Sequence, residues 1–178
     1  MDKYKIIVTG PFSAGKTTFI KALSDTPVVS TDEKISDGSG DSQKRTTTVG
    51  IDFGRVDVDQ DLGIYLFGTP GQERFNFIWE DLIRGSLGIM IMVDRTDFRS
   101  VLEAKKFIQF YTSRTSIPIV IVANKSDKPD GMALEMLRKF FDPICSYPII
   151  EASGVDKLAA QNALNTIFFE IISQQASK

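Results

Sequence analysis

The stretch that decides the fold is Gly10-Pro11-Phe12-Ser13-Ala14-Gly15-Lys16-Thr17. It fits the phosphate-binding pattern G-x-x-x-x-G-K-[ST] at every fixed position. A β-branched run at residues 4–9 precedes it, and an apolar run typical of a helix follows at residues 17–23. In a strand, loop and helix of this kind, backbone N–H groups line a concave loop and the helix N-terminus adds partial positive charge. The stretch therefore predicts a polyphosphate site.

Each fixed residue of this loop has a chemical reason. Gly10 and Gly15 let the backbone approach phosphate oxygens where a Cβ would collide. Lys16 places a positive charge near the β and γ phosphates, and the Thr17 hydroxyl suits Mg²⁺. An ordinary glycine turn is the alternative interpretation. The further candidates for phosphate contact are the neighbouring residues Ser13, Ala14 and Thr18.

Composition favours one globular domain over residues 1–178. The chain is 42% hydrophobic and 25% charged, close to the average for such domains. Its net charge of −2 gives no electrostatic reason to expect nucleic acid or an anionic membrane as a partner. The absence of histidine removes the commonest general base and metal ligand. The single cysteine, Cys145, favours a reducing compartment.

The ends of the chain predict a cytoplasmic protein without a direct membrane anchor. Asp2 stands where myristoylation needs glycine, and the last residues carry no cysteine for prenylation. The first residues do not form a signal peptide. No apolar run approaches the roughly 18 to 20 residues of a membrane span. We expect a monomer.

Short strands alternate with amphipathic helices along the rest of the chain. Such alternation predicts an α/β fold with a doubly wound, mostly parallel sheet and helices on both faces. The turn at residues 60–63 makes a hairpin, so one of six strands is antiparallel. The polar stretch at residues 24–47 is long for a connection and predicts a mobile functional loop. The expected strands are residues 4–9, 49–58, 64–67, 87–93, 117–122 and 147–150, and the expected helices are 17–23, 72–83, 98–111, 130–141 and one capped by Asp156.

The segment Asn124-Lys125-Ser126-Asp127 follows a predicted strand and has the form N-K-x-D. A carboxylate at Asp127 can accept hydrogen bonds from N1–H and the exocyclic amine of guanine, an edge that adenine lacks. Asn124 either binds guanine N7 or braces the loop, and the stem of Lys125 can lie along the ring. A polar loop with a helix cap is the alternative. The segment predicts guanine selectivity on the order of 10⁴.

A second polar segment, Glu151-Ala152-Ser153-Gly154, follows the last predicted strand. The backbone N–H groups of Ser153 and Gly154 are candidates to bind guanine O6. An ordinary loop is an equal alternative, because this segment alone is a weak pattern. In a doubly wound sheet, ligands bind at the carboxyl ends of the strands, which is where all these segments fall.

Taken in order, residues 10–17, 48–53, 68–75, 124–127 and 151–153 resemble the five signature motifs of Ras-superfamily small GTPases over the whole chain. The segments T-V-G-I-D-F and G-Q-E-R-F are similar to Rab proteins. G-T-P-G-Q and the missing lipid anchor are more similar to prokaryotic members, whose relatives include gliding-motility GTPases that work with roadblock-domain partners.

The resemblance implies a P-loop small G domain that switches between GDP and GTP with Mg²⁺. It implies slow hydrolysis without a partner, and effector and regulatory proteins, among them possible roadblock-domain proteins, that read two switch loops. Switch I would cover about residues 25–50, and switch II about 68–84. By resemblance, Thr48 would ligate Mg²⁺ in the GTP form, Gly71 would donate its N–H to the γ-phosphate, and Gln72 would position the attacking water beside Lys16.

Three positions depart from the family pattern. Gly68 stands where most members have the aspartate of D-x-x-G, so a carboxylate near Mg²⁺ is missing. Phe12 stands over the expected γ-phosphate, where it either obstructs an arginine from a partner or packs outward. Val155 replaces the usual lysine after the last motif. Gly68 and Phe12 favour the alternative of a guanine-nucleotide scaffold with little hydrolysis, whereas Thr48 and Gln72 favour the switch. A nucleotide kinase is disfavoured, because the chain lacks an arginine-rich lid.

Three further residues carry hypotheses. Arg45 lies three residues before Thr48, an offset that resembles the built-in arginine of heterotrimeric G-protein alpha subunits. Arg45 is either a catalytic arginine in cis or a solvated surface residue. Phe77 falls on the polar face of its predicted helix, which makes it a candidate partner contact or a solitary exposed residue. Trp79 falls on the apolar stripe and is expected in the core.

Overall fold

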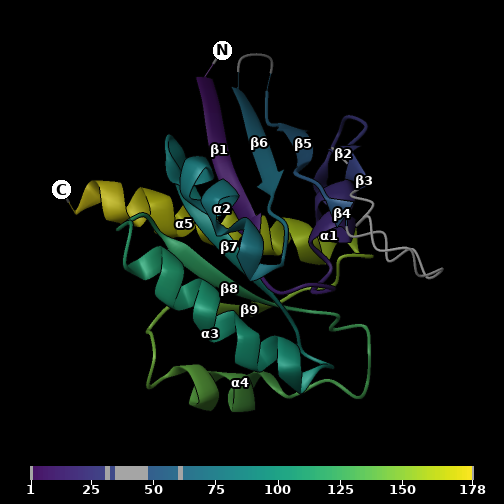
Figure 1. Ribbon diagram of the computed structural model, residues 1–178. Helices are drawn as coiled ribbons and strands as arrows, with labels where there is room; N and C mark the ends of the chain where they lie inside the picture. The colour runs from purple at the N-terminus through teal and green to yellow at the C-terminus, as the bar shows by residue number, and fades with distance from the viewer. Residues whose placement is uncertain (1, 31–32, 35–47, 60–61, 178) are drawn as a thin grey trace.

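The computed structural model describes residues 2–30, 33–34, 48–59 and 62–177 (Figure 1). Strands and helices alternate, as the sequence predicts. Their bounds are β1 Asp2–Thr9, α1 Lys16–Leu23, β2 Val29–Ser30, β3 Glu33–Lys34, β4 Thr48–Val49, β5 Asp52–Asp57, β6 Leu62–Gly68, the 3₁₀ turn η1 Glu73–Phe75, α2 Asn76–Ile83, β7 Ser86–Asp94, α3 Phe98–Thr112, β8 Ile119–Asn124, α4 Leu134–Phe141, β9 Ile149–Glu151 and α5 Lys157–Ala176.

The main sheet has the strand order β2-β5-β6-β1-β7-β8-β9. β6, β1, β7, β8 and β9 run parallel to one another. β5 is antiparallel to β6, and β2 is antiparallel to β5. The predicted α/β fold with a mostly parallel sheet is confirmed. The predicted number of six strands is wrong for the described residues, which form a 7-stranded sheet, because β2 pairs with the outer edge of β5 and satisfies its backbone groups.

Two layers of helices enclose the sheet (Figure 1). α1 and α5 pack on one face, with Phe19, Ile20 and Ile167 fully buried. α2, α3 and α4 pack on the other face, where Trp79 is 2% exposed and lies in the core as predicted. The central strands are buried on both faces, which explains why β7 and β8 are continuous apolar runs rather than alternating ones.

Three predicted element bounds are wrong, two of them for reasons that lie in tertiary contacts. The helix expected at residues 72–83 begins as the 3₁₀ turn η1, and α2 begins only at Asn76. The strand expected at residues 49–58 is divided, because β4 pairs with β3 while β5 pairs with β6. The helix expected from Asp130 begins only at Leu134. Arg95 holds the preceding residues outside the helix, since its carbonyl accepts from Met132 N–H at 2.8 Å and its guanidinium donates to the Gly131 carbonyl at 3.3 Å.

The cap of the last helix is as predicted. The Asp156 carboxylate accepts from the N–H groups of Leu158 at 2.9 Å and Ala159 at 3.2 Å, and α5 begins at Lys157. None of the described helices combines the length and hydropathy that a membrane span requires.

The parallel register brings the polar motifs to one edge of the sheet. β1 ends before the phosphate loop, β6 ends at Gly68, and β8 ends at Asn124. β9 ends at Glu151, next to Ala152-Ser153-Gly154. Segments separated by more than a hundred residues therefore meet at the carboxyl edge, where ligands bind in sheets of this kind.

Candidate nucleotide-binding site

The phosphate loop joins β1 to α1 and depends on two glycines in unusual conformations. Gly10 has φ +133°, and a Cβ there would lie 2.2 Å from the Met92 carbonyl oxygen. Gly15 has φ +92°, and a Cβ there would lie 2.2 Å from Asn124 Nδ2. Both positions exclude other residues by conformation and by space. The loop is therefore held close to β7 and β8 even before any ligand is considered.

Lys16 lies inside this loop. Its ammonium donates to the carbonyl oxygens of Gly10 at 2.8 Å and Pro11 at 2.6 Å. Burial lowers the pKa of Lys16 to about 8, although the charge of Asp52 opposes this shift. Among the described residues the hydrogen-bond acceptors of this buried ammonium are two neutral carbonyls, so an anion in the loop would stabilise it further.

The other predicted phosphate contacts surround this ammonium. Ala14 is buried, whereas the side chains of Ser13, Thr17 and Thr18 are exposed at the loop and the first turn of α1. Ser13 has φ +62°, a left-handed conformation that is uncommon outside glycine. Such backbone strain is often found at ligand loops, where it turns consecutive N–H groups to one side.

Asn124 is the link between the phosphate loop and the N-K-x-D segment. It is 2% exposed, and its Nδ2 donates to the Ala14 carbonyl at 2.8 Å. Its Oδ1 accepts from Gly154 N–H at 2.9 Å. Of the two predicted roles for Asn124, this structure shows the one in which its side chain braces the loops. The Gly154 N–H is bonded to Asn124 in this structure, so it does not face a base.

Asp127 and Ser153 form the polar end of the site. The Ser153 hydroxyl donates to Asp127 Oδ1 at 2.8 Å and holds the pKa of that carboxyl below its usual value. An ionised Asp127 is an acceptor only, which suits the two N–H donors of a guanine edge. Lys125 has φ +65°, and its ammonium pairs with the Asp94 carboxylate at the end of β7.

The segment after β6 packs directly on the phosphate loop. A Cβ on Gly71 would lie 2.5 Å from the backbone nitrogen of Phe12, so only glycine fits this contact. Gln72 is half-buried beside it. The indole of Trp79 donates to the Pro70 carbonyl at 2.8 Å and fixes the same segment to the core.

Phe12 and Gln72 share a cavity of about 290 Å³ between the phosphate loop, the segment after β6 and α3. The Phe12 ring is 65% exposed, so it stands at the mouth of this cavity rather than in the core. The other lining residues are Gly71, Glu73, Trp79, Glu103, Lys106 and Phe107.

The residues present fit a Mg²⁺ ion beside bound phosphates. The Thr17 hydroxyl donates to Asp52 Oδ2 at 2.5 Å, which places two hard oxygen donors together at the start of α1. No group of three or more His, Cys, Asp or Glu in the described ranges is arranged to hold a metal by itself. Mg²⁺ in phosphate sites needs only one or two protein ligands, so the pair is sufficient. The sequence patterns did not single out Asp52 as a site residue. The feature that could have pointed to Asp52 was the missing aspartate at Gly68, because Gly68 is the partner of Asp52 in the sheet.

Two predicted residues of the loop before β5 are less fully described. Thr48 is described through its backbone, in β4, where it pairs with Lys34. Arg45 lies outside the described residues, as does most of the stretch expected to be switch I. The site as described therefore consists of the phosphate loop, Asp52, the Gly71-Gln72 segment and the two loops after β8 and β9.

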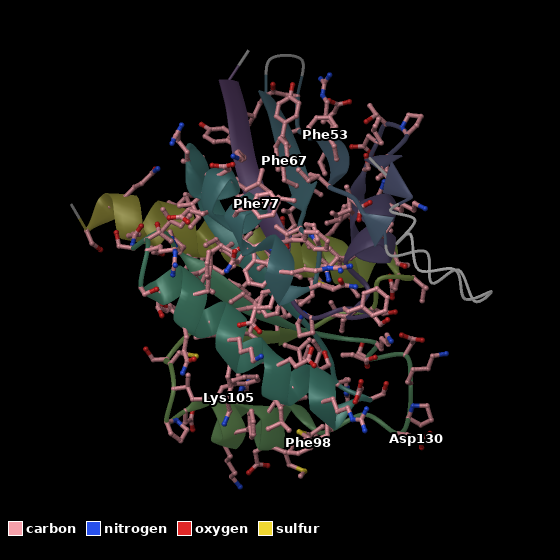
Figure 2. The ribbon with its side chains drawn as sticks, in the orientation of Figure 1. Phe53, Phe67, Phe77, Phe98, Lys105 and Asp130 are labelled. Atoms are coloured by element: carbon pink, nitrogen blue, oxygen red, sulfur yellow. The ribbon has the colours of Figure 1, made fainter. Side chains whose placement is uncertain are left out.

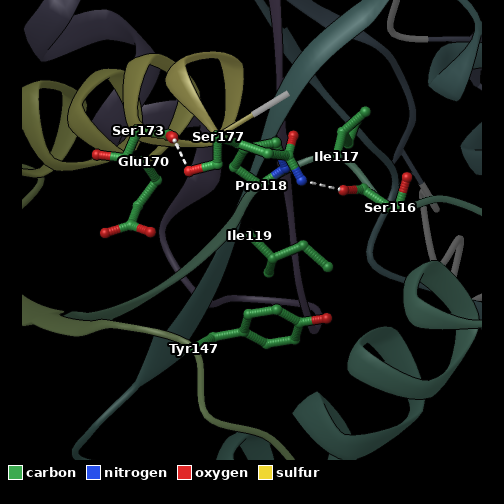
Figure 3. Close-up of a pocket in the computed structure, with 9 residues that line it drawn as sticks. Ser116, Ile117, Pro118, Ile119, Tyr147, Glu170, Ser173 and Ser177 are labelled. Atoms are coloured by element: carbon green, nitrogen blue, oxygen red, sulfur yellow. Dashed lines mark hydrogen bonds between the residues drawn. The ribbon is translucent and has the colours of Figure 1, made fainter.

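A larger cavity, of about 380 Å³, lies at the opposite end of β8 (Figure 3). Its polar groups bond one another: Gln174 donates to the Ser116 carbonyl at 2.6 Å, and Ser177 donates to the Ser173 carbonyl at 2.9 Å. The bond from Gln174 fastens the end of α5 to the loop before β8, and the bond from Ser177 lies within the end of α5. The cavity is remote from every predicted site residue, and none of them lines it.

Comparisons with known proteins agree with this architecture. A protein-family model described as "Conserved hypothetical ATP binding protein" matches residues 26–161. The "Ras-related protein RABD2a" of Arabidopsis thaliana is 28% identical, over 98% of this chain and 83% of the relative. The "ADP-ribosylation factor-related protein 1" of Bos taurus is 29% identical, over 82% of this chain and 70% of the relative.

The "GTP-binding protein YPT1" of Saccharomyces cerevisiae is 30% identical, over 97% of this chain and 82% of the relative. These relatives are small GTPases, and the matches cover most of this chain. Residues 26–161 belong to the family of the matching model. The chain as a whole belongs to the Ras superfamily of small GTPases.

Proposed function

We propose that this protein binds GTP with Mg²⁺, hydrolyses it slowly to GDP, and signals the bound nucleotide to a protein partner through two loops. One observation carries the proposal: Asn124 joins the phosphate loop to the loop after β9 through both ends of its amide. The anion-binding loop and Asp127 are thereby held as one rigid site, which suits a ligand with phosphates at one end and a base at the other.

The proposed base is guanine. Asp127 has its carboxylate oriented by Ser153 and is exposed at the site, ready to accept two parallel N–H bonds. Adenine presents an acceptor at N1 and lacks the exocyclic amine at C2, so it would leave the carboxylate facing a lone pair. The name of the matching family model refers to ATP. The carboxylate of Asp127, which accepts hydrogen bonds and donates none when ionised, favours GTP over ATP.

The proposed chemistry is phosphoryl transfer to water. Lys16 and the loop N–H groups would neutralise the phosphates, and Mg²⁺, held by Thr17 and Thr48, would supply further positive charge. Gln72 lies beside the loop and is the candidate to orient the attacking water. Positioning and charge neutralisation are sufficient for slow hydrolysis, so the absence of histidine is no obstacle.

The proposed switch loops are residues 25–50 and 68–84. Thr48 and Gly71 would contact the γ-phosphate side of GTP and lose those contacts after hydrolysis. Phe77 projects from α2 with 59% of its surface exposed (Figure 2) and is the proposed contact for an effector or regulator. A roadblock-domain protein is one candidate partner, from resemblance alone.

Single-turnover hydrolysis of bound GTP by the purified protein tests the proposal. A rate on the order of 10⁻² s⁻¹ would match a catalytic arginine in cis, and Arg45→Ala would then lower it while the neighbouring Lys44→Ala would not. A rate near roughly 10⁻⁴ s⁻¹ would match a switch that needs a partner. Binding without any turnover above the uncatalysed rate would replace the proposal by the nucleotide scaffold.

A further inference from the structure

The family's D-x-x-G aspartate is missing at Gly68, yet a carboxylate occupies the same space. Asp52 of β5 is the direct partner of Gly68 of β6 in the antiparallel pair. Partners in a strand pair project their side chains from the same face of the sheet. Asp52 therefore points toward α1 from beside the place where the family aspartate would begin.

This structure leaves no room for a side chain at residue 68 beside Asp52. A Cβ on Gly68 would lie 2.9 Å from the Cβ of Asp52 and 3.2 Å from its Oδ2. It would also lie 2.7 Å from Cδ1 of Ile20, which is a flexible side-chain end. Backbone-anchored Cβ atoms do not approach that closely, so with Asp52 in place the backbone of this structure accommodates only glycine at residue 68.

Both oxygens of Asp52 are already oriented. Oδ2 accepts from the Thr17 hydroxyl at 2.5 Å, and Oδ1 accepts from the Ser30 hydroxyl of β2. The half-buried carboxylate is thus fixed against the one phosphate-loop side chain that suits Mg²⁺. Hydrogen bonds of this kind orient ligands around a metal and tune their affinity.

We propose that Asp52 is the carboxylate of the Mg²⁺ site, relocated from β6 to the facing strand β5. The proposal rests on the proposed function, because it needs a nucleotide in the phosphate loop. It answers how the metal is held without the family aspartate. It also moves the carboxylate from β6, the strand that leads into Gly71 and Gln72, to β5, the strand that follows Thr48 and switch I.

The test measures the rate at which a fluorescent GDP analogue is released as the Mg²⁺ concentration is raised. The quantity compared between variants is the Mg²⁺ concentration at the midpoint of the change from fast to slow release. Asp52→Asn keeps the shape and removes the charge, and we expect this midpoint to rise about 10- to 100-fold. The matched control is Asp57→Asn on the same strand, whose carboxylate pairs with Arg55 at 2.6 Å, and its midpoint should equal that of the wild type. The exchange of both residues, Asp52→Gly with Gly68→Asp, should restore the midpoint to within a few-fold of the wild type.

The outcomes separate this proposal from the proposed function. If the wild type fails to bind GDP at any Mg²⁺ concentration, the proposed function is wrong and the metal site with it. If the wild type binds GDP and Asp52→Asn leaves the midpoint unchanged, the relocation is wrong and the nucleotide site stands. Ser30→Ala gives a second measurement that keeps the carboxylate: we expect a several-fold rise in the midpoint, and an unchanged midpoint would count against the oriented Asp52.

Discussion

Removal of the Asn124 amide should cost the protein stability before any nucleotide is added. Asn124→Ala leaves the Ala14 carbonyl and the Gly154 N–H without their partners, which now lie at 2.8 Å and 2.9 Å. Each orphaned buried group costs about 1–3 kcal/mol, so we expect the free energy of unfolding to fall by about 2–6 kcal/mol. For a chain of this size the melting temperature should fall by roughly 4–24 °C.

The assay is thermal and urea unfolding of the nucleotide-free protein, followed by circular dichroism. The matched control is Asn162→Ala on the exposed side of α5, which should change the free energy of unfolding by less than about 0.5 kcal/mol. A second measurement uses 7-deaza-GTP, which lacks the N7 acceptor. If Asn124 is a brace, the wild type should bind this analogue as tightly as GTP.

Two results would refute the reasoning about Asn124. One is an Asn124→Ala variant as stable as the wild type, because the amide would then contribute nothing to the nucleotide-free fold. The other is a large loss of affinity for 7-deaza-GTP in the wild type, because Asn124 would then turn from the loop to the base when nucleotide binds. Either result would remove the main structural link between the phosphate loop and Asp127.

Three further predictions concern the base and the phosphates. Asp127→Asn should change the binding preference from GTP to XTP, because xanthine carries an oxygen where guanine carries the amine. A variant that still binds GTP more tightly than XTP would contradict the proposed contact. Ser153→Ala should raise the pKa of Asp127 and lower the affinity for GTP about 3- to 10-fold, since one hydrogen bond is worth about 0.5–1.5 kcal/mol. The affinity would be measured by titration with GTP at pH 7, and an unchanged value would count against the orienting bond. Burial lowers the pKa of Lys16 to about 8, and a bound phosphate should raise this pKa again. Calorimetry of GTP binding in buffers of different ionisation enthalpy should therefore show that Lys16 takes up about half a proton at pH 8 and much less at pH 7. No proton uptake at pH 8 would refute this prediction.

Local sequence patterns were sufficient for most of the fold. The run before the phosphate loop forms β1, the apolar stripe ending at Ile83 forms α2, and Asp156 caps α5 as predicted. These features depend on residues within a few positions of each other. The predicted start of α4 was wrong because Arg95, far away in the sequence, bonds Gly131 and Met132 and holds them outside the helix.

The site shows the same division. The phosphate loop and the N-K-x-D segment could be recognised because each is contiguous. The choice between two roles for Asn124 could not be made, since its partner Ala14 lies 110 residues away and Gly154 lies 30 residues away. Asp52 was missed for the same reason: its meeting with Thr17 depends on the register of β5 against β6. The missing aspartate at Gly68 was visible in the sequence, and its replacement required the sheet.

The selectivity between GTP and ATP tests the central claim most directly. The dissociation constants of both nucleotides would be measured by competition against fluorescent GDP with the wild-type protein and Mg²⁺. A rigid site in which Asp127 reads the guanine edge predicts that GTP binds on the order of 10⁴-fold more tightly than ATP. Equal affinities, or tighter binding of ATP, would contradict it.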